Sequence, residues 1–392
     1  MDTAPSTPAP SCQPMSRPKI LHVLGSLLAN DVGEEVVAVA GALVRAGVDT
    51  RVVSLGGRGE LTERLEEAQV RTYALSLTSS LGVLRAVGKV RTLIRATGVD
   101  AVHGYGSWGG TVVQLAAPRD VGVVRSLLGP PVRGEDLRGR MLRLLERRAL
   151  GRHATRFVVP SDRELRVAVR SYAAAEGHVT ILPTSVDVAS IQERVSQTTV
   201  ESARRLMGIR EGDTVFVLAS KFHSEGVMDG ILTGLSMARV ENPGIRIFMV
   251  GAGPHEGAAR WKAEELKLED SVVFLGEGME ASAIWAAADA AIDSTLGAMW
   301  ARPALVAMAA GLPAVKMDVE ATEDESQRNE PHSTMSGRPE LFAAELVRLA
   351  GDPMLREVIR GQQADVVAEA DVARAVEELE VLYASVIADA QA

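Results

Sequence analysis

"IRIFMVGAGPHEGAARWKAEELKLEDSVVFLGE", residues 245–277, contains the pattern that decides the fold. An apolar run rich in β-branched residues meets a Gly-x-Gly-Pro turn, and a longer helical segment follows before a second apolar run at 271–275. Two apolar runs joined in this way read as parallel strands with a crossover helix between them. The stretch therefore predicts a right-handed βαβ unit.

The same alternation continues in both directions along the chain. Short runs rich in Val, Ile and Leu, bounded by turn residues, are typical of strands in a parallel sheet. The first half contains "KILHVLGS", "TRVVSLGG", "VRTYALS", "DAVHGYGS", "VGVVRSL", "TRFVVPSD" and "VTILPTS", and the second half contains "TVFVLAS", "IRIFMVG", "SVVFLGE", "AAIDS" and "PAVKMD". The pattern predicts an α/β protein with two Rossmann-like, doubly wound parallel-sheet domains.

The changes in pattern suggest where the domains begin and end. We expect a disordered leader at 1–17, a first domain at 18–190, a linker at 191–199, a second domain at 200–370 and a C-terminal helix at 371–392. That last helix is expected to pack back on the first domain. Open α/β sheets bind ligands at the carboxyl ends of their strands, so we expect a central cleft there.

Composition narrows the class of protein. The chain has 392 residues, 46% of them hydrophobic, which is enough for two cores of ordinary size. Its net charge of −9, from 42 basic and 51 acidic residues, argues against nucleic acid as the main partner. A single cysteine, Cys12, excludes a disulfide framework and a cysteine metal cluster, as expected for the cytoplasm. No apolar run approaches the ~18 residues of a membrane span.

Seven segments, taken in order, point to a known family. They are "ILHVLGSL", "VDAVHGYGSWGG", "RFVVPSDREL", "VTILPTSVD", "VGAGPHEGAARWKAEELKLEDSVVFLGE", "AAADAAIDS" and "VAMAAGLPAV". Their order resembles the GT-B glycosyltransferases, and most closely family 4, the glycosyl transferases group 1. The resemblance implies a retaining transfer of a hexose from a nucleotide sugar, such as a UDP- or GDP-sugar, to a glycan or lipid-linked acceptor. It implies no metal and no other cofactor.

The resemblance also implies where the first domain would meet its substrates. Family members carry a Gly-Gly pair in the first loop, and this chain has Asp31 and Val32 there, with Gly25 kept earlier in the loop. Gly25 is a substrate-binding candidate, or it simply ends a strand at a tight turn. His103 is the catalytic candidate, since a His at a strand end can orient a hydroxyl, while the family's second His is Tyr105 here. Alternatively, His103 hydrogen-bonds to a neighbouring backbone group.

The stretch "VFVLASKFHSEGVMDG", residues 215–230, takes the place of the family's phosphate loop. A leaving diphosphate needs cations, which the family supplies as an Arg after the strand and a Lys before a Gly. Here Ser220 stands at the Arg position with Lys221 beside it, and Glu225 stands at the Lys position before Gly226. Glu225 opposes phosphate in one reading, and in the other it stabilises the helix that begins there.

The family's remaining donor contacts are partly lost. Its two glutamates, which meet the donor sugar and the ribose, are replaced by Ala298 and Val306. The substrate-binding candidates that remain in this half are Gly251, Gly253, Ser294 and Arg302. Arg302 lies at the start of a predicted helix, whose free amide groups attract anions.

Two hypotheses about function follow from these residues. In the first, the chain is an active glycosyltransferase that holds its donor through Lys221, Arg302 and backbone amides. In the second, it is a catalytically inactive homologue that serves as a binding or scaffolding subunit of an active glycosyltransferase.

Two further stretches have open readings. The Arg-rich segment 133–156 is either a face for peripheral contact with an anionic membrane or a solvated helix. The acidic, polar segment 318–340 is expected to be a mobile surface loop, since its residues lack metal-ligand spacing.

Overall fold

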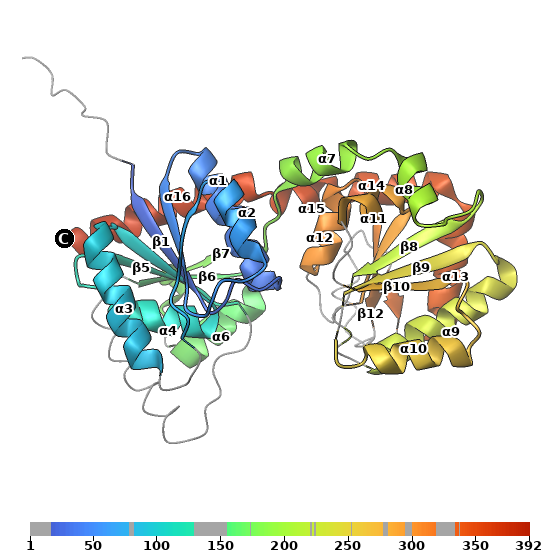
Figure 1. Ribbon diagram of the computed structural model, residues 1–392, viewed down its shortest axis with the longest axis horizontal. Helices are drawn as coiled ribbons and strands as arrows, with labels where there is room; N and C mark the ends of the chain where they lie inside the picture. The colour runs from blue at the N-terminus through green and yellow to red at the C-terminus, as the bar shows by residue number, and fades with distance from the viewer. Residues whose placement is uncertain are drawn as a thin grey trace, which may run out of the picture. The chain divides into compact units, whose positions relative to one another are not determined.

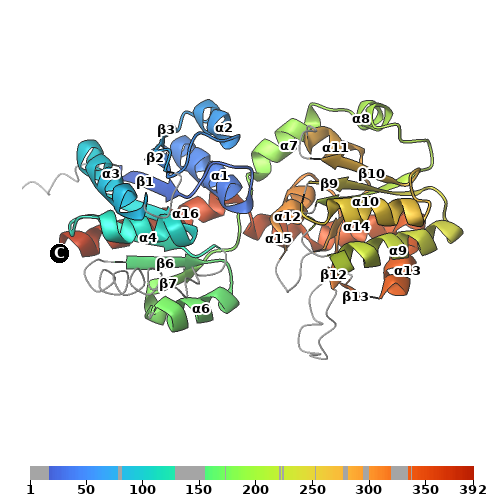
Figure 2. The same ribbon diagram turned by 60° about the horizontal axis from the view of Figure 1, so that its bottom comes forward.

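The chain forms two α/β units, as the sequence predicts. A computed structural model describes residues 17–77, 82–128, 155–172, 174–219, 222, 225–251, 253–276, 281–294, 300–318, 334–336 and 338–392. Unit 1 comprises Met1–Ile181 together with Glu378–Ala392, and unit 2 comprises Leu182–Glu377. Each unit contains a parallel sheet with helices on both faces (Figures 1 and 2).

The sheet of unit 1 has seven parallel strands in the order β3-β2-β1-β4-β5-β6-β7. Their bounds are β1 Lys19–Leu24, β2 Asp49–Ser54, β3 Arg71–Ala74, β4 Ala101–Tyr105, β5 Gly122–Ser126, β6 Thr155–Val159 and β7 Val179–Ile181. The order reverses between β1 and β4, which are hydrogen-bonded neighbours. This is a topological switch point, where open α/β sheets place their ligand sites.

Alternation along the strands of unit 1 sends side chains to both faces of the sheet. On one face Leu21 and Val23 pack with helices α3 and α4, and on the other Leu24 packs with α1 and α2. Among the described residues, the helices of this unit are α1 Asp31–Arg45, α2 Leu61–Glu67, α3 Gly82–Thr97, α4 Gly106–Ala116, α6 Asp162–Tyr172 and the 3-10 helix η1 Glu176–His178. Two apolar layers therefore enclose the sheet.

The end of the C-terminal helix is part of unit 1. Helix α16 spans Val372–Gln391, and its residues from Glu378 onward cluster with this unit. Gly122 at the start of β5 lies against it, because a Cβ there would come within 2.9 Å of the Val386 side chain. Arg156 of β6 forms an ion pair with Asp389 near the end of the helix.

The sheet of unit 2 has six parallel strands in the order β10-β9-β8-β11-β12-β13. Their bounds are β8 Thr214–Ala219, β9 Ile245–Val250, β10 Val272–Gly276, β11 Ala290–Asp293, β12 Ala314–Asp318 and β13 Thr334–Ser336. The order reverses between β8 and β11, which gives this sheet its own switch point.

Helices enclose the second sheet on both faces. Side chains of α9, α10 and α13 form one apolar cluster with the strands, and those of α11 and α12 form another. The helices are α7 Val188–Ser196, α8 Val200–Leu206, α9 Glu225–Glu241, α10 Glu256–Glu265, α11 Ala281–Ala287, α12 Arg302–Ala309, α13 Pro339–Gly351, α14 Pro353–Gln362 and α15 Ala364–Glu369.

The fold class is confirmed, and two details differ from the sequence-based expectation. Residues 191–199, expected to link the domains, include the end of α7 and cluster with unit 2. Within 318–340, expected to be a loop, Thr334–Ser336 forms β13 and pairs with β12. A three-residue strand is too short to show alternation in the sequence. In the described parts of the chain, no helix combines the length and apolar character needed to cross a membrane.

Candidate active site

Most of the predicted donor-side residues follow strands of the second sheet at its carboxyl edge. Gly251 and Gly253 follow β9, Ser294 follows β11, and Glu225 with Gly226 opens α9 after β8. Gly251 has φ of +120°, a conformation that side chains rarely adopt, so its glycine is required by the turn. Ser220 and Lys221 lie outside the described residues. The candidate donor site is therefore assembled from loops at this edge of unit 2.

Between β8 and α9, the structure describes Phe222. Its ring is fully buried in the core of unit 2, although its φ of +46° lies in the left-handed region. The amide of His255 donates a hydrogen bond to its carbonyl oxygen over 3.2 Å. Since a bulky residue in this region is strained, the buried ring and this bond are what hold Phe222 in its conformation.

Glu225 is the first residue of α9 and its carboxylate is largely exposed. Its Oε2 lies 3.8 Å from Nδ1 of His255, the residue that precedes α10. The carboxylate also stands at the positive end of the α9 dipole, which stabilises a negative charge. Both effects explain a Glu at this position without a ligand, and the same carboxylate would repel a phosphate.

Arg302 begins α12, but its guanidinium has a partner in unit 2. Nη1 donates a hydrogen bond to the backbone carbonyl of Ser185, which is itself buried. Pro303 in the first turn and Gly311 after the end of the helix fit the usual helix boundaries, and φ of Gly311 is +90°. The Arg302 guanidinium, which was predicted to contact phosphate, therefore makes a hydrogen bond within the protein that holds the start of α12 against Ser185.

Two buried charged residues at this edge were missed by sequence reasoning. Asp293 ends β11, and Lys316 lies opposite it in β12. Asp293 Oδ2 accepts a hydrogen bond from the amide of Ala301 over 3.0 Å and lies 4.0 Å from Lys316 Nζ. Lys316 Nζ also lies 5.3 Å from the centre of the Trp300 ring. A lysine within the apolar run "PAVKMD" was the available signal.

The structure describes one of the two positions at which the family has a glutamate. Val306 lies in α12 and packs, partly buried, against apolar side chains that include Ile191 and Leu305. Ala298 lies outside the described residues. Val306 therefore makes apolar contacts at the position where the family resemblance implies a contact to the ribose.

In unit 1 the loop after β1 is held by contacts among its own residues. Asn30 precedes α1 and its Oδ1 accepts a hydrogen bond from the Gly33 amide over 3.0 Å. A Cβ at Gly33 would come within 2.5 Å of the Leu28 carbonyl oxygen, so this glycine is required. A Cβ at Gly25 would meet the Trp108 ring at an ordinary 3.5 Å. A side chain would therefore fit at position 25, and crowding does not explain the glycine there.

His103, the predicted catalytic residue, lies inside the core of unit 1 and is 1% exposed. Its Nδ1 is 2.7 Å from the Tyr383 hydroxyl of α16, and its Nε2 is 2.8 Å from Ser126 Oγ. Its partners are side chains, whereas the alternative reading expected a backbone group. Tyr105, at the family's second His position, is 2% exposed and its hydroxyl lies 3.1 Å from Nδ1 of His22. In this structure neither side chain reaches solvent at the sheet edge.

Burial favours the neutral forms of His22, His103, Tyr105 and Tyr383. It lowers the pKa of His22 to about 3, and it lowers that of His103 well below the usual value, with a further contribution from His22. Burial also raises the pKa of Tyr105 and of Tyr383. All four groups are therefore neutral near pH 7, and the cluster is an uncharged hydrogen-bonded network.

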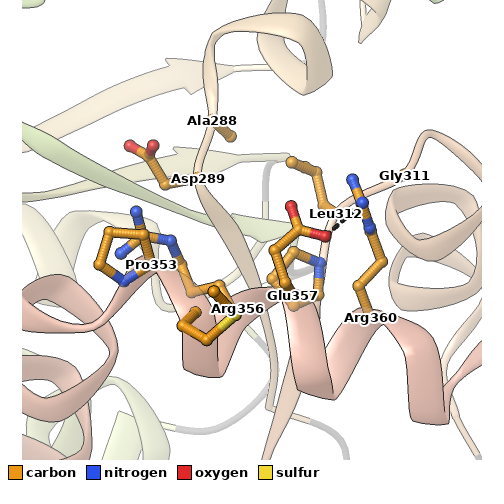
Figure 3. Close-up of a pocket in the computed structure, with 10 residues that line it drawn as sticks. Ala288, Asp289, Gly311, Leu312, Pro353, Arg356, Glu357 and Arg360 are labelled. Carbon is orange, nitrogen blue, oxygen red and sulfur yellow. Dashed lines mark hydrogen bonds and ion pairs between the residues drawn. The ribbon is translucent and has the colours of Figure 1, made fainter.

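A separate pocket of about 350 Å³ lies at the opposite edge of the second sheet. Its lining residues precede β11 and β12 or belong to α14, as Figure 3 shows. They are Ala288, Asp289, Gly311, Leu312, Pro313, Pro353, Met354, Arg356, Glu357 and Arg360. Because these residues lie at the amino ends of the strands, the pocket is not part of the candidate donor site.

Two family models match the chain, and together they cover most of both units. The Glycosyl transferase 4-like domain matches residues 32–184, and the Glycosyl transferases group 1 model matches residues 214–352. The two matches and the shared fold identify the chain as a group 1 glycosyltransferase-like protein of the GT-B fold. The resemblance inferred from the order of the sequence segments is thereby confirmed.

Two solved structures illustrate the shared fold. HepE of Anabaena, whose crystal structure is a complex with UDP-glucose, is 16% identical with a TM-score of 0.72, over 94% of this chain and 100% of that one. A glycosyltransferase of Rickettsia africae is 13% identical with a TM-score of 0.71, over 95% and 99%.

One curated protein matches part of this chain. The alpha-monoglucosyldiacylglycerol synthase of Streptococcus pneumoniae is 22% identical over 138 residues, which are 34% of this chain. The match spans 31% of the relative's own length.

Proposed function

We propose that this chain transfers a hexose from a nucleotide sugar to a glycan or lipid-linked acceptor, with retention of configuration. The observation that carries the proposal is the carboxyl edge of unit 2, where Gly251, Gly253, Gly226 and the start of α12 stand at the ends of parallel strands. Backbone at such an edge can approach a diphosphate closely. The complex of HepE with UDP-glucose and the name of the glucosyl-transferring relative support a nucleotide-sugar donor.

In this proposal the protein stabilises the leaving diphosphate by electrostatics. Bond cleavage at the donor transfers negative charge to the diphosphate, and preorganised donors lower the energy of that charge. Lys221 would supply an ammonium, and the first amides of α12 would supply the positive end of a helix dipole. No base is assigned in unit 1, since His103 and Tyr105 are both buried and bonded to other side chains.

A second candidate is a homologue without transfer activity that binds or scaffolds an active glycosyltransferase. Three contacts favour it. Arg302 is bonded to Ser185, Glu225 lies beside His255, and His103 is bonded to Tyr383. At each of these candidate positions, a polar side chain contacts a group of the protein itself.

Nucleotide sugars are expected to raise the melting temperature if the donor site works. Ligand at 100 times its dissociation constant stabilises the folded state by about 2.7 kcal/mol. We expect a thermal shift with one member of a panel of UDP-, GDP- and ADP-sugars and the free nucleotides. Lys221→Ala should abolish the shift, whereas Arg205→Ala, an exposed change on α8, should leave it intact.

The outcome of this panel separates the two candidates. A shift that depends on Lys221 supports the donor site and directs the search for transfer activity. If no nucleotide shifts the melting temperature at millimolar concentration, the transfer proposal fails. In that case, recovery of a second, motif-complete glycosyltransferase with the native protein would support the scaffolding candidate.

Reversal of charge at Glu225 is expected to strengthen diphosphate binding. Glu225→Lys restores the ammonium that the family resemblance places before Gly226, and a charge-assisted contact with phosphate follows. We expect the dissociation constant of the nucleotide to fall by roughly tenfold, measured by calorimetry. Glu241→Lys, the same change at the other end of α9, is the control and should have little effect. Weaker binding in Glu225→Lys would show that the phosphate lies elsewhere.

A further inference from the structure

Helix α3 of unit 1 is basic on the side that faces solvent. Its exposed residues include four cations, Arg85, Lys89, Arg91 and Arg95. The sequence of the helix, "GVLRAVGKVRTLIRAT", contains no acidic residue. The whole chain, in contrast, has a net charge of −9, so α3 concentrates positive charge in an acidic protein. A surface with an excess of one sign attracts a partner of the opposite sign.

The cations of α3 are not neutralised by carboxylates. Among the described residues, no Asp or Glu forms an ion pair with any of the four. Lys89 Nζ donates a hydrogen bond to the Leu75 carbonyl over 3.3 Å. The guanidinium of Arg91 donates to the carbonyls of Leu115 and Ala116 over 2.6 and 3.1 Å. Because these carbonyls are uncharged, both side chains keep their full positive charge at the surface.

An apolar side chain lies beside the cations. Leu84 is 75% exposed and directly precedes Arg85. The other exposed positions of the helix are small residues, Gly88, Thr92 and Ala96. The opposite side of α3 packs with α4 in the core of unit 1, so the helix is held firmly in the fold (Figure 1). Long basic side chains around an exposed leucine are typical of a helix that lies on a membrane surface.

We propose that α3 is a docking surface for a membrane that contains anionic lipids. A bilayer of this kind has negative headgroups above an apolar interior, which match the cations and the exposed leucine of the helix. Nucleic acid offers the negative charge without the apolar layer. A lipid-linked acceptor lies in such a membrane, so docking would bring the chain to that acceptor. Since the contact itself needs no nucleotide sugar, it is independent of the proposed function.

The first experiment measures binding of the full chain to lipid vesicles without any nucleotide. In salt of about 0.1 M, vesicles of phosphatidylcholine with an equal part of phosphatidylglycerol should bind at least roughly tenfold more tightly than phosphatidylcholine alone. Each Lys or Arg near an anionic surface strengthens binding by about fivefold. Arg85→Gln combined with Arg95→Gln should therefore weaken binding by roughly 25-fold. Arg205→Gln combined with Arg210→Gln changes two exposed arginines of unit 2 and should have little effect.

A fluorescent label tests whether α3 itself meets the lipid. Residues 129–154, which include most of the Arg-rich segment 133–156, lie outside the described residues, so vesicle binding alone would not identify the contact. Leu84→Cys in a Cys12→Ser protein carries one thiol for an environment-sensitive dye. Its emission should shift to the blue on anionic vesicles, because position 84 enters the apolar boundary. Val240→Cys, at a position 84% exposed on α9, is the control and should not respond.

Three outcomes would overturn the proposal. Absence of binding to anionic vesicles would do so and would leave the proposed function standing, because no nucleotide takes part. Binding that is unchanged by the double substitution of Arg85 and Arg95 would place the contact elsewhere. Equal or tighter binding to oligothymidylate or polyglutamate, with no blue shift of the dye on vesicles, would favour nucleic acid or an acidic protein as the partner.

Discussion

Tyr383→Ala is expected to lower the free energy of unfolding of unit 1 by about 3–5 kcal/mol, as for other large aromatic residues truncated in a core. Tyr383 is fully buried although it lies only nine residues before Ala392. Its ring lies edge-on to those of His22 and His103. Its hydroxyl is bonded to His103, so the truncation would leave both a cavity and an unpaired ring nitrogen.

Urea unfolding followed by circular dichroism would measure this loss, with hydrogen exchange of the β1 and β4 amides to assign it to unit 1. Tyr383→Phe keeps the ring and removes the hydroxyl, so a loss of roughly 1–3 kcal/mol is expected. Val381→Ala is the control, because Val381 is 72% exposed on the same helix. A Tyr383→Ala protein as stable as the control would show that the end of α16 contributes little to unit 1.

The fold could be predicted because its signal is repeated. Each apolar run that is followed by a helical segment, such as "IRIFMVG", predicts the same βαβ arrangement. A wrong assignment of one strand therefore does not change the predicted architecture. β13 was missed because Thr334–Ser336 gives three residues of signal within a polar stretch. The pairing of that strand with β12 is decided by the sheet it joins, which no local pattern encodes.

The site was harder to predict because side-chain partners are set by tertiary contacts. His103 and Tyr383 are 280 positions apart, and no spacing rule connects them. Arg302 and Ser185 are separated by 117 positions in the same way. A polar residue at a strand end reads as functional in the sequence, whereas the structure shows that it can equally well bond to a distant part of the core. The Asp293 and Lys316 pair was overlooked for the same reason.

Acid is expected to destabilise unit 1 more steeply than exposed carboxylates alone would cause. In the folded state burial lowers the pKa of His22 to about 3 and that of His103 well below its usual value. In the unfolded chain both return to about 6.5. Above pH 6.5 neither state binds these protons, so the two residues leave stability unchanged. Below it, the unfolded state binds protons that the folded state excludes, and the free energy of unfolding falls as pH falls.

The surroundings of the two histidines offer little to offset this effect. Tyr105, Tyr383 and Ser126 contact the rings, and both tyrosines stay neutral because burial raises their pKa values. Glu35 of α1, itself buried, acts electrostatically on Tyr105. For each histidine the loss is roughly 1 kcal/mol per pH unit, and for His22 it ends near pH 3, where the folded state also binds the proton.

Urea unfolding of the wild type and of His22→Phe between pH 7 and pH 4 would measure the effect. His22→Phe removes one titrating group and fills the same apolar space, so its stability should depend less steeply on pH below 6.5, by roughly 1 kcal/mol per pH unit. Since the carboxylates are common to both proteins, their contribution cancels in the difference. His178→Gln, a change of an exposed histidine in η1, is the control and should keep the wild-type slope. Identical slopes for His22→Phe and the wild type would show that His22 binds its proton in the folded state as well, and that the buried cluster opens without unfolding.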